Sequence, residues 1–170
     1  MALHLSVPPD AVVDNEELSA PTPLLRPSAG LPAVIDTEDA LTTALAELAR
    51  GTGPFALDAE RASGYKYSAR AYLIQIKRNG GGLHLIDPIA IGDSPYWKEM
   101  SDTFSDQEWI IHASTQDLAC LREVGIEPKV IFDTELAGRI AGCERVGLGP
   151  LTEQLLDVTL AKEHSAVDCS

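Results

Sequence analysis

The chain has 170 residues, of which 45% are hydrophobic, and its formal net charge is −13 at pH 7. This length supports one ordinary α/β domain with a core and leaves little room for a second one. Three cysteines without a Cys-x-x-Cys pair argue against a disulfide framework and a structural zinc site. The sequence has neither a basic leader nor an apolar run of about 20 residues, which predicts a soluble, cytoplasmic chain.

The negative charge is distributed unevenly along the chain. Residues 1–47 contain eight acidic residues and a single base, Arg26. Residues 61–78 contain no acidic residue, and three tyrosines lie among their bases, which are Arg61, Lys66, Arg70, Lys77 and Arg78. Bases attract phosphates and aromatic rings stack on nucleobases. This segment is therefore the candidate nucleic-acid contact in an otherwise acidic chain.

Residues 1–30 are interpreted as an N-terminal tail rich in proline and acids, because they show neither a strand nor a helix period. The tail is extended, partly disordered or packed onto the domain. Residues 31–170 are expected to form that domain. It begins with a short strand over 32–36 and a helix over about 38–50, capped by Asp36 or Thr37 and ending at Gly51. The apolar stripe of this helix comprises Ala40, Leu41, Ala44, Leu45 and Leu48.

Three strands are predicted next, over residues 55–60, 71–77 and 83–87, with a glycine-rich hairpin turn over 79–82. Helices over 94–105, 115–124 and 134–141 then alternate with strands over 108–112 and 130–133. A strand meander followed by alternating helices and strands indicates an α/β fold, a mixed sheet flanked by helices. The Gly-Leu-Gly-Pro run at 147–150 lacks the lysine and hydroxyl of a phosphate-binding loop, so we interpret it as a turn.

Asp58 and Glu60 lie two residues apart in the predicted strand over 55–60. Side chains at positions i and i+2 of a strand point the same way, so both carboxylates face one side while Leu57 and Ala59 face the other. Two adjacent anions repel each other, and a divalent cation would compensate their charge. Because hard oxygen ligands suit Mg²⁺ or Mn²⁺, a metal-dependent phosphoryl site is the first functional hypothesis.

Asp117 is the third candidate carboxylate, at the start of the predicted helix over 115–124. One interpretation is structural, because Ser114-x-x-Asp117 fits a capping box and an acid in the first turn interacts favourably with the helix dipole. The other is functional, because active sites of α/β sheets gather where strands end and helices begin. His112 ends the preceding strand and also has a structural and a functional interpretation. It is either a histidine at the sheet edge whose hydrogen bonds are satisfied, or a residue of the cleft.

Four segments together resemble ribonuclease D and its relatives, the tyrosine branch of the DEDD superfamily of 3′–5′ exonucleases. The segments read LDAERASGYKYSARAYLIQI, HLIDP, IIHASTQDLACL and IFDTELAGRIAG. The first family motif, Asp-x-Glu, is matched by Asp58 and Glu60. The second, an aspartate in a His-Ala-x-x-x-Asp-Leu context, is matched by Asp117. The resemblance spans about residues 31–160 and implies a ribonuclease H-like fold.

This resemblance implies hydrolysis of terminal phosphodiesters of RNA by two Mg²⁺ or Mn²⁺ ions about 3.5–4 Å apart. Asp58 would bridge both ions, Glu60 would bind the first ion and orient the attacking water, and Asp117 would hold the second ion. The substrate would be the single-stranded 3′ end of RNA, with DNA as a possible substrate.

The same resemblance suggests five substrate-binding residues. Tyr65, or Tyr67 in its place, would stack a base, Lys66 or Arg70 would approach phosphate, and Gln75 and His112 would line the cleft. Other roles remain open for several of them. Gln75 could satisfy only buried backbone groups, and Lys66 and Arg70 could form a solvated loop face.

The sequence departs from the family at the third motif, Tyr-x-x-x-Asp, which supplies the fourth metal-binding acid and the tyrosine that positions water. The last tyrosine of the chain is Tyr96, far too early for this motif. His164-x-x-x-Asp168 has the right spacing with histidine in place of tyrosine, but the histidine branch of the superfamily uses one more intervening residue. We interpret this match as coincidental and expect an exonuclease domain that is incomplete at its C-terminus.

Loss of one ligand and of the tyrosine should weaken catalysis strongly. Two functional classes therefore remain. The first is the exonuclease domain of an enzyme of RNA processing or turnover, inactive or weak as this chain. The second is a nucleic-acid-binding module of the same fold without the chemistry. A DNA-directed exonuclease is a further alternative, because nothing in the sequence senses the 2′-hydroxyl.

Overall fold

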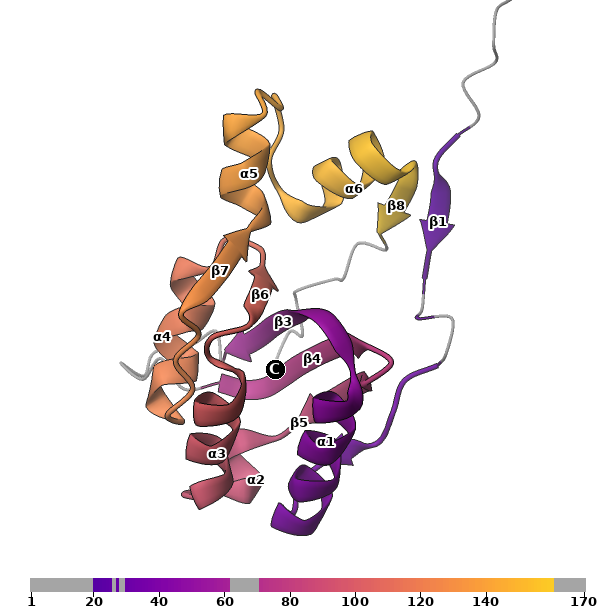
Figure 1. Ribbon diagram of the computed structural model, residues 1–170. Helices are drawn as coiled ribbons and strands as arrows, with labels where there is room; N and C mark the ends of the chain where they lie inside the picture. Colours follow the sequence, from indigo (N-terminus) through magenta and orange to yellow (C-terminus); the bar gives the residue numbers. More distant parts are fainter. Residues whose placement is uncertain (1–19, 26, 28–29, 62–70, 161–170) are drawn as a thin grey trace, which may run out of the picture.

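The computed structural model describes residues 20–25, 27, 30–61 and 71–160 (Figure 1). A mixed sheet is surrounded by helices, as the sequence predicts, and a smaller two-stranded sheet lies at one end of the molecule. The elements in chain order are β1 (Thr22–Leu24), β2 (Val34–Ile35), α1 (Glu38–Arg50), β3 (Thr52–Arg61), β4 (Ala71–Asn79), β5 (Gly82–Ile86), α2 (Pro88–Ile91), α3 (Pro95–Phe104), β6 (Glu108–Ile111), α4 (Thr115–Glu123), β7 (Val130–Asp133), α5 (Thr134–Ile140), α6 (Leu148–Leu156) and β8 (Val158–Leu160).

The larger sheet has six strands in the order β2-β5-β4-β3-β6-β7. β3, β4 and β5 form the predicted antiparallel meander. β6 adds parallel to β3, β7 adds parallel to β6, and β2 pairs in parallel with β5 at the other edge. Parallel neighbours end at the same edge of a sheet, so the residues that follow β3, β6 and β7 are brought close together.

The core lies where α1, α3 and α4 cover the sheet. β3 alternates strictly, with Phe55, Leu57 and Ala59 buried and the residues between them exposed. This alternation is the period of a strand with one covered face. The helices contribute apolar residues at helical spacing, which are Leu41, Leu45 and Leu48 of α1, Trp97, Met100 and Phe104 of α3, and Cys120 and Leu121 of α4.

The boundaries of α1 agree with the sequence prediction. The Thr37 hydroxyl accepts a hydrogen bond from the Ala40 N–H at 3.4 Å and caps the first turn. Gly51 ends the helix with a φ of −69°, so it does not serve as a left-handed cap. A Cβ at Gly51 would lie 2.8 Å from Cδ of Arg78 and 2.9 Å from the Asn79 carbonyl oxygen. Glycine is required here by this close approach of β4.

Arg78 ties the end of α1 to the sheet. Its guanidinium is 9% exposed and donates to the carbonyl oxygens of Leu48 at 2.9 Å and Gly53 at 3.1 Å, and to the side chain of Gln107. It also lies 4.3 Å from the centroid of the Phe55 ring, within cation–π range. The Leu48 carbonyl oxygen in the last turn of α1 thus accepts from the Arg78 side chain as well as from the Gly51 N–H.

The glycine turn of the meander is confirmed. Gly80 and Gly82 have φ values of +70° and +85°, a conformation that side chains with a Cβ adopt only at a cost. Figure 1 shows β4 and β5 side by side on either side of this turn. The one-turn helix α2 after β5 is not predicted by the sequence analysis. It begins at Pro88 and is capped by the carboxylate of Asp87.

The C-terminal part of the described chain differs from the sequence expectations. The turn interpretation of residues 147–150 is wrong, because Leu148 begins α6 and Gly147 is its N-terminal cap residue. Neither β8 nor its parallel partner β1 is predicted. β1 lies within the proposed N-terminal tail and pairs with β8, so this part of the tail packs onto the domain. Short elements of three residues carry too little periodicity to be recognised.

β7, α5 and α6 leave apolar side chains exposed. A groove of about 450 Å³ runs between these elements, and Phe132, Leu148, Leu151 and Leu155 contribute to its walls. In Figure 1, α5 and α6 lie beyond the edge of the large sheet, away from α1 and α3. Within the described ranges, none of the helices is long and apolar enough to cross a membrane.

Candidate active site

Asp58 and Glu60 lie on the exposed face of β3, as predicted. Both are exposed, whereas Leu57 and Ala59 on the opposite face are buried. The pairing of β3 with β4 sets this geometry, because Asp58 lies opposite Gln75 and Glu60 lies opposite Leu73. Two carboxylates thus occupy one face near the carboxyl end of the central strand.

Gln75 contacts the first of these carboxylates directly. Its side-chain amide donates a hydrogen bond to Oδ2 of Asp58 at 3.2 Å. The interpretation that Gln75 satisfies only buried backbone groups is therefore wrong. An amide that donates to a carboxylate limits the rotamers of the acid.

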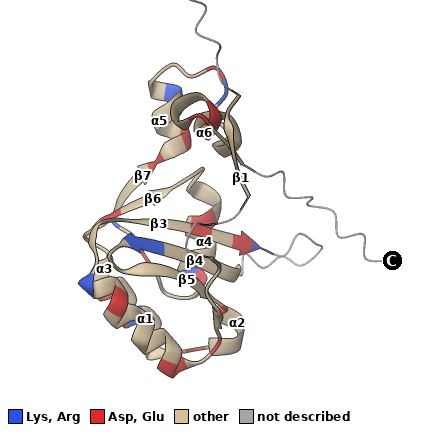
Figure 2. Ribbon diagram, turned by 90° about the vertical axis from the view of Figure 1, so that its right-hand side faces the viewer, with Lys and Arg blue, Asp and Glu red and all other residues tan. Residues whose placement is uncertain are grey.

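Asp117 lies in the first turn of α4, which contacts β3. Asp117 is only 7% exposed. Burial, followed by the nearby carboxylate of Asp58, raises the pKa of Asp117 to about 6. Arg61 lowers this pKa, while Glu60 raises it further. Figure 2 shows acidic residues at the end of β3 and on the neighbouring α4. The three sequence-predicted carboxylates therefore share one region of negative potential.

The capping-box interpretation of Ser114 and Asp117 is wrong. Ser114 has helical dihedral angles, a φ of −53° and a ψ of −25°, and its side chain makes no cap hydrogen bond. A capping residue needs an extended backbone to aim its hydroxyl at the first free N–H groups. A capping role therefore does not explain why Asp117 is buried beside Asp58.

The residue that holds the segment before α4 is Asp133, the N-terminal cap residue of α5, which the sequence analysis did not single out. Its carboxylate accepts hydrogen bonds from the N–H groups of Ala113 at 3.1 Å and Ser114 at 2.9 Å. Burial alone would raise the pKa of Asp133, but the hydrogen bonds from Ser114, Leu136 and Glu135 outweigh it and lower the pKa. An aspartate at the end of a strand, directly before a helix, was the available signal in the sequence.

Two further polar contacts surround these acids. The Arg61 guanidinium at the end of β3 donates to the side chain of Gln116, the residue before Asp117. The ring of His112 contacts the Thr134 hydroxyl through Nδ1 at 2.9 Å. His112 is thus a satisfied histidine at the sheet edge, and its proposed part in substrate binding remains a prediction.

Several predicted residues lie outside the described residues. These are the base-stacking and phosphate candidates Tyr65, Lys66 and Arg70, together with the His164 and Asp168 pair. Of the eight residues predicted for the site, the structure describes Asp58, Glu60, Gln75, His112 and Asp117. The first three share the same face of adjacent strands, and Asp117 approaches that face from α4.

The carboxylate oxygens of Asp58, Glu60 and Asp117 have the chemistry that suits a hard divalent cation, but they are not gathered around one point. Across residues 20–25, 27, 30–61 and 71–160, no three His, Cys, Asp or Glu side chains come close enough to form a metal site. Burial is the main cause of the raised pKa of Asp117, and the repulsion from Asp58 and Glu60 that adds to it is the part that a bound cation would relieve. Carboxylate oxygens are the ligands that Mg²⁺ and Mn²⁺ prefer.

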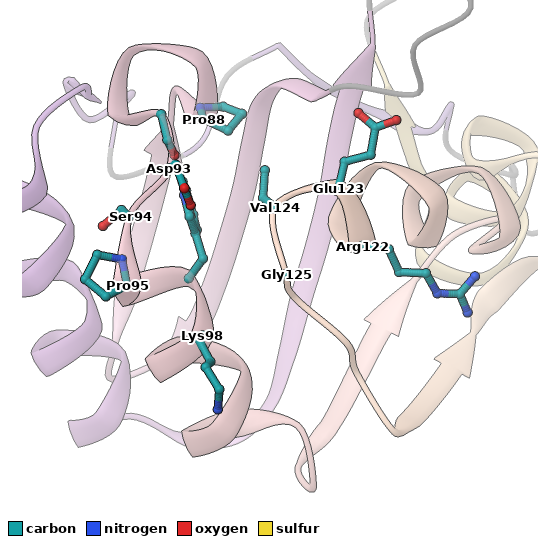
Figure 3. Close-up of a pocket in the computed structure, with 11 residues that line it drawn as sticks. Pro88, Asp93, Ser94, Pro95, Lys98, Arg122, Glu123, Val124 and Gly125 are labelled. Carbon is teal, nitrogen blue, oxygen red and sulfur yellow. The ribbon is translucent and has the colours of Figure 1, made fainter.

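A separate cavity of about 1030 Å³ lies between the α2–α3 connection and the end of α4. Figure 3 shows Lys98 on α3 and Arg122 on α4 on opposite sides of it. None of the five described site residues lines this cavity, and its lining also includes the acids Asp93 and Glu123. The cavity is therefore separate from the carboxylates of Asp58, Glu60 and Asp117, and its lining carries charges of both signs.

Comparison with known proteins agrees with this geometry. Residues 32–170 match a family model described as 3′–5′ exonuclease. A ribonuclease D of Pseudomonas paraeruginosa is 31% identical over 122 residues, a match that covers 69% of this chain and 31% of that protein. The crystal structure of a protein from Bifidobacterium adolescentis is 46% identical with a TM-score of 0.80, and the match covers 87% of this chain and 36% of that one.

The crystal structure of Escherichia coli RNase D, described as an exoribonuclease involved in structured RNA processing, is 30% identical with a TM-score of 0.64. This match covers 81% of the present chain and 36% of that enzyme. The chain thus spans about a third of the length of these relatives. Since the family model extends over most of the sequence and the mixed sheet is shared with these structures, the chain belongs to the 3′–5′ exonuclease family and is ribonuclease D-like, with a ribonuclease H-like fold.

Proposed function

We propose that this chain is the metal-dependent 3′–5′ exonuclease domain of a ribonuclease D-like enzyme, formed by residues 31–170, and that it acts on the single-stranded 3′ ends of RNA. The observation that carries this proposal is the electrostatic coupling of Asp117 to Asp58 and Glu60. These are the three acids of the two family motifs, and Asp117 lies 57 positions after Glu60 in the sequence. Repulsion among carboxylates is the charge arrangement that a bound divalent cation relieves.

Asp58, Glu60 and Asp117 would hold two Mg²⁺ or Mn²⁺ ions. When bound, these ions supply an activated water and stabilise the charge on the leaving 3′ oxygen. Gln75 keeps Asp58 oriented through its hydrogen bond, and Arg61 restrains the first turn of α4 through Gln116. Tyr65, Lys66 and Arg70 would bind the terminal nucleotides, and His112 would line the cleft.

Metal binding is the first test and does not depend on turnover. Calorimetric titration of the chain with MnCl₂ should show binding at millimolar metal or below. The Asp58→Asn variant should weaken it by more than about tenfold, because even outer partners of metal ligands contribute about 10–100-fold. The matched control is Asp102→Asn, which changes an exposed acid paired with Lys98 on α3 and should leave binding unchanged. No binding by the wild-type chain would contradict the metal-dependent function.

Hydrolysis is the second test. A single-stranded RNA labelled at its 5′ end and carrying a 3′-hydroxyl should be shortened stepwise with Mn²⁺ or Mg²⁺, at the low rate expected without the third family motif, and the same RNA blocked by a 3′-phosphate should not. Asp58→Asn should abolish the shortening while Asp102→Asn retains it. Equal degradation by Asp58→Asn would show that the activity does not belong to this site. A DNA of the same sequence, run in parallel, measures the preference for the 2′-hydroxyl.

A second candidate function is a nucleic-acid-binding module of the same fold without catalysis. The observation that favours it is that, among the described residues, no three His, Cys, Asp or Glu side chains are gathered as a metal site would require. Binding of fluorescent RNA with no shortening at any metal concentration would support this candidate. Shortening that requires Asp58 would exclude it.

A further inference from the structure

One carboxylate links the starts of two helices at the edge of the site. Asp133 is the last residue of β7, and its Oδ1 accepts hydrogen bonds from the N–H groups of Glu135 at 2.9 Å and Leu136 at 3.3 Å in its own helix α5. The same Oδ1 accepts from Ala113 at 3.1 Å, and Oδ2 accepts from Ser114 at 2.9 Å. Ala113 and Ser114 come directly before α4. Four otherwise free N–H groups therefore converge on one side chain.

The backbone at Ala113 needs this support. Ala113 has a φ of +53°, a left-handed conformation that is unfavourable for a residue with a Cβ. The strained residue lets the chain leave β6 and enter α4 within a few residues, and Ser114 supplies no side-chain cap of its own. A strained turn persists only where its surroundings hold it. The Gln116 N–H donates to the Ala113 carbonyl oxygen at 3.5 Å, and the side-chain contacts that hold the turn come from Asp133.

The position of Asp117 depends on the same turn. Asp117 lies three residues after Ser114, and the N–H of Leu118 donates to the carbonyl oxygen of Ser114 at 2.9 Å, which closes the first turn of α4. β6 and β7 are parallel and aligned, with Ile111 opposite Asp133. The end of β7 thus fixes the position of the first turn of α4, and with it the position of the Asp117 carboxylate.

We propose that Asp133 is a positioning residue for the metal site: by anchoring Ala113 and Ser114, it holds the carboxylate of Asp117 beside Asp58. This inference rests on the proposed function, because it assigns Asp117 to metal binding. A ligand set is effective only when the shell behind it fixes each ligand within about 0.5 Å of its working position. Asp133 would supply this restraint without touching the metal or the substrate.

Asp133→Asn separates this role from simple helix capping. Asparagine caps helices about as well as aspartate, so its amide oxygen can still accept from Glu135 and Leu136. Its NH₂ group then takes the place of Oδ2 and faces the N–H of Ser114, donor against donor. A second variant, Asp133→Ser, also caps α5 but is too short to reach Ser114. Both variants should fold, with cooperative thermal unfolding.

The matched control is Asp87→Asn. Asp87 also caps a helix through one oxygen, which accepts from Ile89 at 2.8 Å and Ala90 at 3.0 Å, but among the described residues these side-chain bonds stay within its own helix α2. It tests whether loss of any capping carboxylate produces the effects expected for Asp133. The same measurements on this variant should reproduce the wild-type values.

The readouts are amide hydrogen exchange in the metal-free chain and Mn²⁺ affinity by calorimetry. Both Asp133 variants should exchange the Leu118 amide at least about tenfold faster and bind Mn²⁺ about 10–100-fold more weakly. Unchanged exchange at Leu118 together with wild-type Mn²⁺ affinity in both variants would overturn the inference. If the wild-type chain itself binds no Mn²⁺, the proposed function fails separately, and exchange at Leu118 alone then decides whether Asp133 anchors α4.

Discussion

The region built from α1, α3 and β3–β6 and the region built from β7, α5 and α6 bury their apolar residues very differently. In the first, Phe55, Trp109 and Ile76 are fully buried, and the two aromatic rings stack with centroids 4.9 Å apart. In the second, Phe132 is 46% exposed and Ile140 is 80% exposed. Both regions have regular helices and strands, so secondary structure forms in each, but only the first closes a core around it.

The comparison shows where the stability of this chain resides. Apolar area removed from water contributes roughly 25 cal/mol per Å², and the second region leaves much of its apolar area in solvent. Its elements are held instead by strand pairing with β6 and by contacts such as the Asp133 hydrogen bonds. The candidate site lies where the two regions meet, because Asp58 belongs to the first and the anchor of α4 belongs to the second.

The largest expected effect contrasts two aromatic residues on neighbouring strands. Trp109→Ala should lower the free energy of unfolding by about 3–5 kcal/mol, because it opens a cavity in the closed core and removes the indole hydrogen bond to the Phe104 carbonyl oxygen. Phe132→Ala, at the aligned position next to Ile110 on β7, should lower it by about 1 kcal/mol or less. Urea denaturation followed by circular dichroism measures both. Equal losses would show that the second region is packed as tightly as the first.

A smaller effect is expected from Arg78, which ties the first region together. Arg78→Met should lower the free energy of unfolding by about 2–3 kcal/mol, because the guanidinium bonds to the carbonyl oxygens of Leu48 and Gly53 are lost and the Leu48 oxygen keeps only the bond from the Gly51 N–H. The control is Arg50→Met, since Arg50 is an exposed residue whose pair with Glu47 spans 3.9 Å and exposed pairs contribute little. The same denaturation experiment applies. A loss of less than about 0.5 kcal/mol in Arg78→Met would contradict the buried role of Arg78.

The smallest expected effect lies at the junction of the two regions and has the opposite sign. The pKa of Asp117 is raised to about 6 in the folded chain, so the folded state binds this proton more tightly than the unfolded state. The stability linked to that proton is complete below the ordinary pKa of aspartate and is lost as the pH rises through about 6. Asp117→Asn should therefore stabilise the metal-free chain by about 1–2 kcal/mol at pH 7.5, below the limit of about 3 kcal/mol for a two-unit shift.

The gain from Asp117→Asn should decline between pH 7 and pH 4 and vanish near pH 3.5. Thermal unfolding at a series of pH values in the presence of EDTA measures it. A stability gain that is independent of pH would show that charge repulsion among Asp117, Asp58 and Glu60 is not its source.

Much of the first region could be predicted because its signals are local. The helix over 38–50 carries its cap, its apolar stripe and its stop within its own residues, and the hairpin after β4 is marked by three consecutive glycines. The second region was predicted less well. Residues 147–150 contain the glycines and proline of a turn yet begin a helix, because proline is also favourable in the first helical turn. The strands β1 and β8 exist only through their pairing with each other.

The sequence by itself determined that Asp58 and Glu60 share one face, because the two-residue period of a strand is a local property of the backbone. It also indicated Asp117 through the order and spacing of the family motifs. Only the tertiary structure decided what surrounds these acids. Asp133 meets Ala113 and Ser114 across about 20 residues, and Asp117 loses its capping role because Ser114 is already helical. Such contacts depend on which strands become neighbours and in what register, which the residues of one segment alone do not specify.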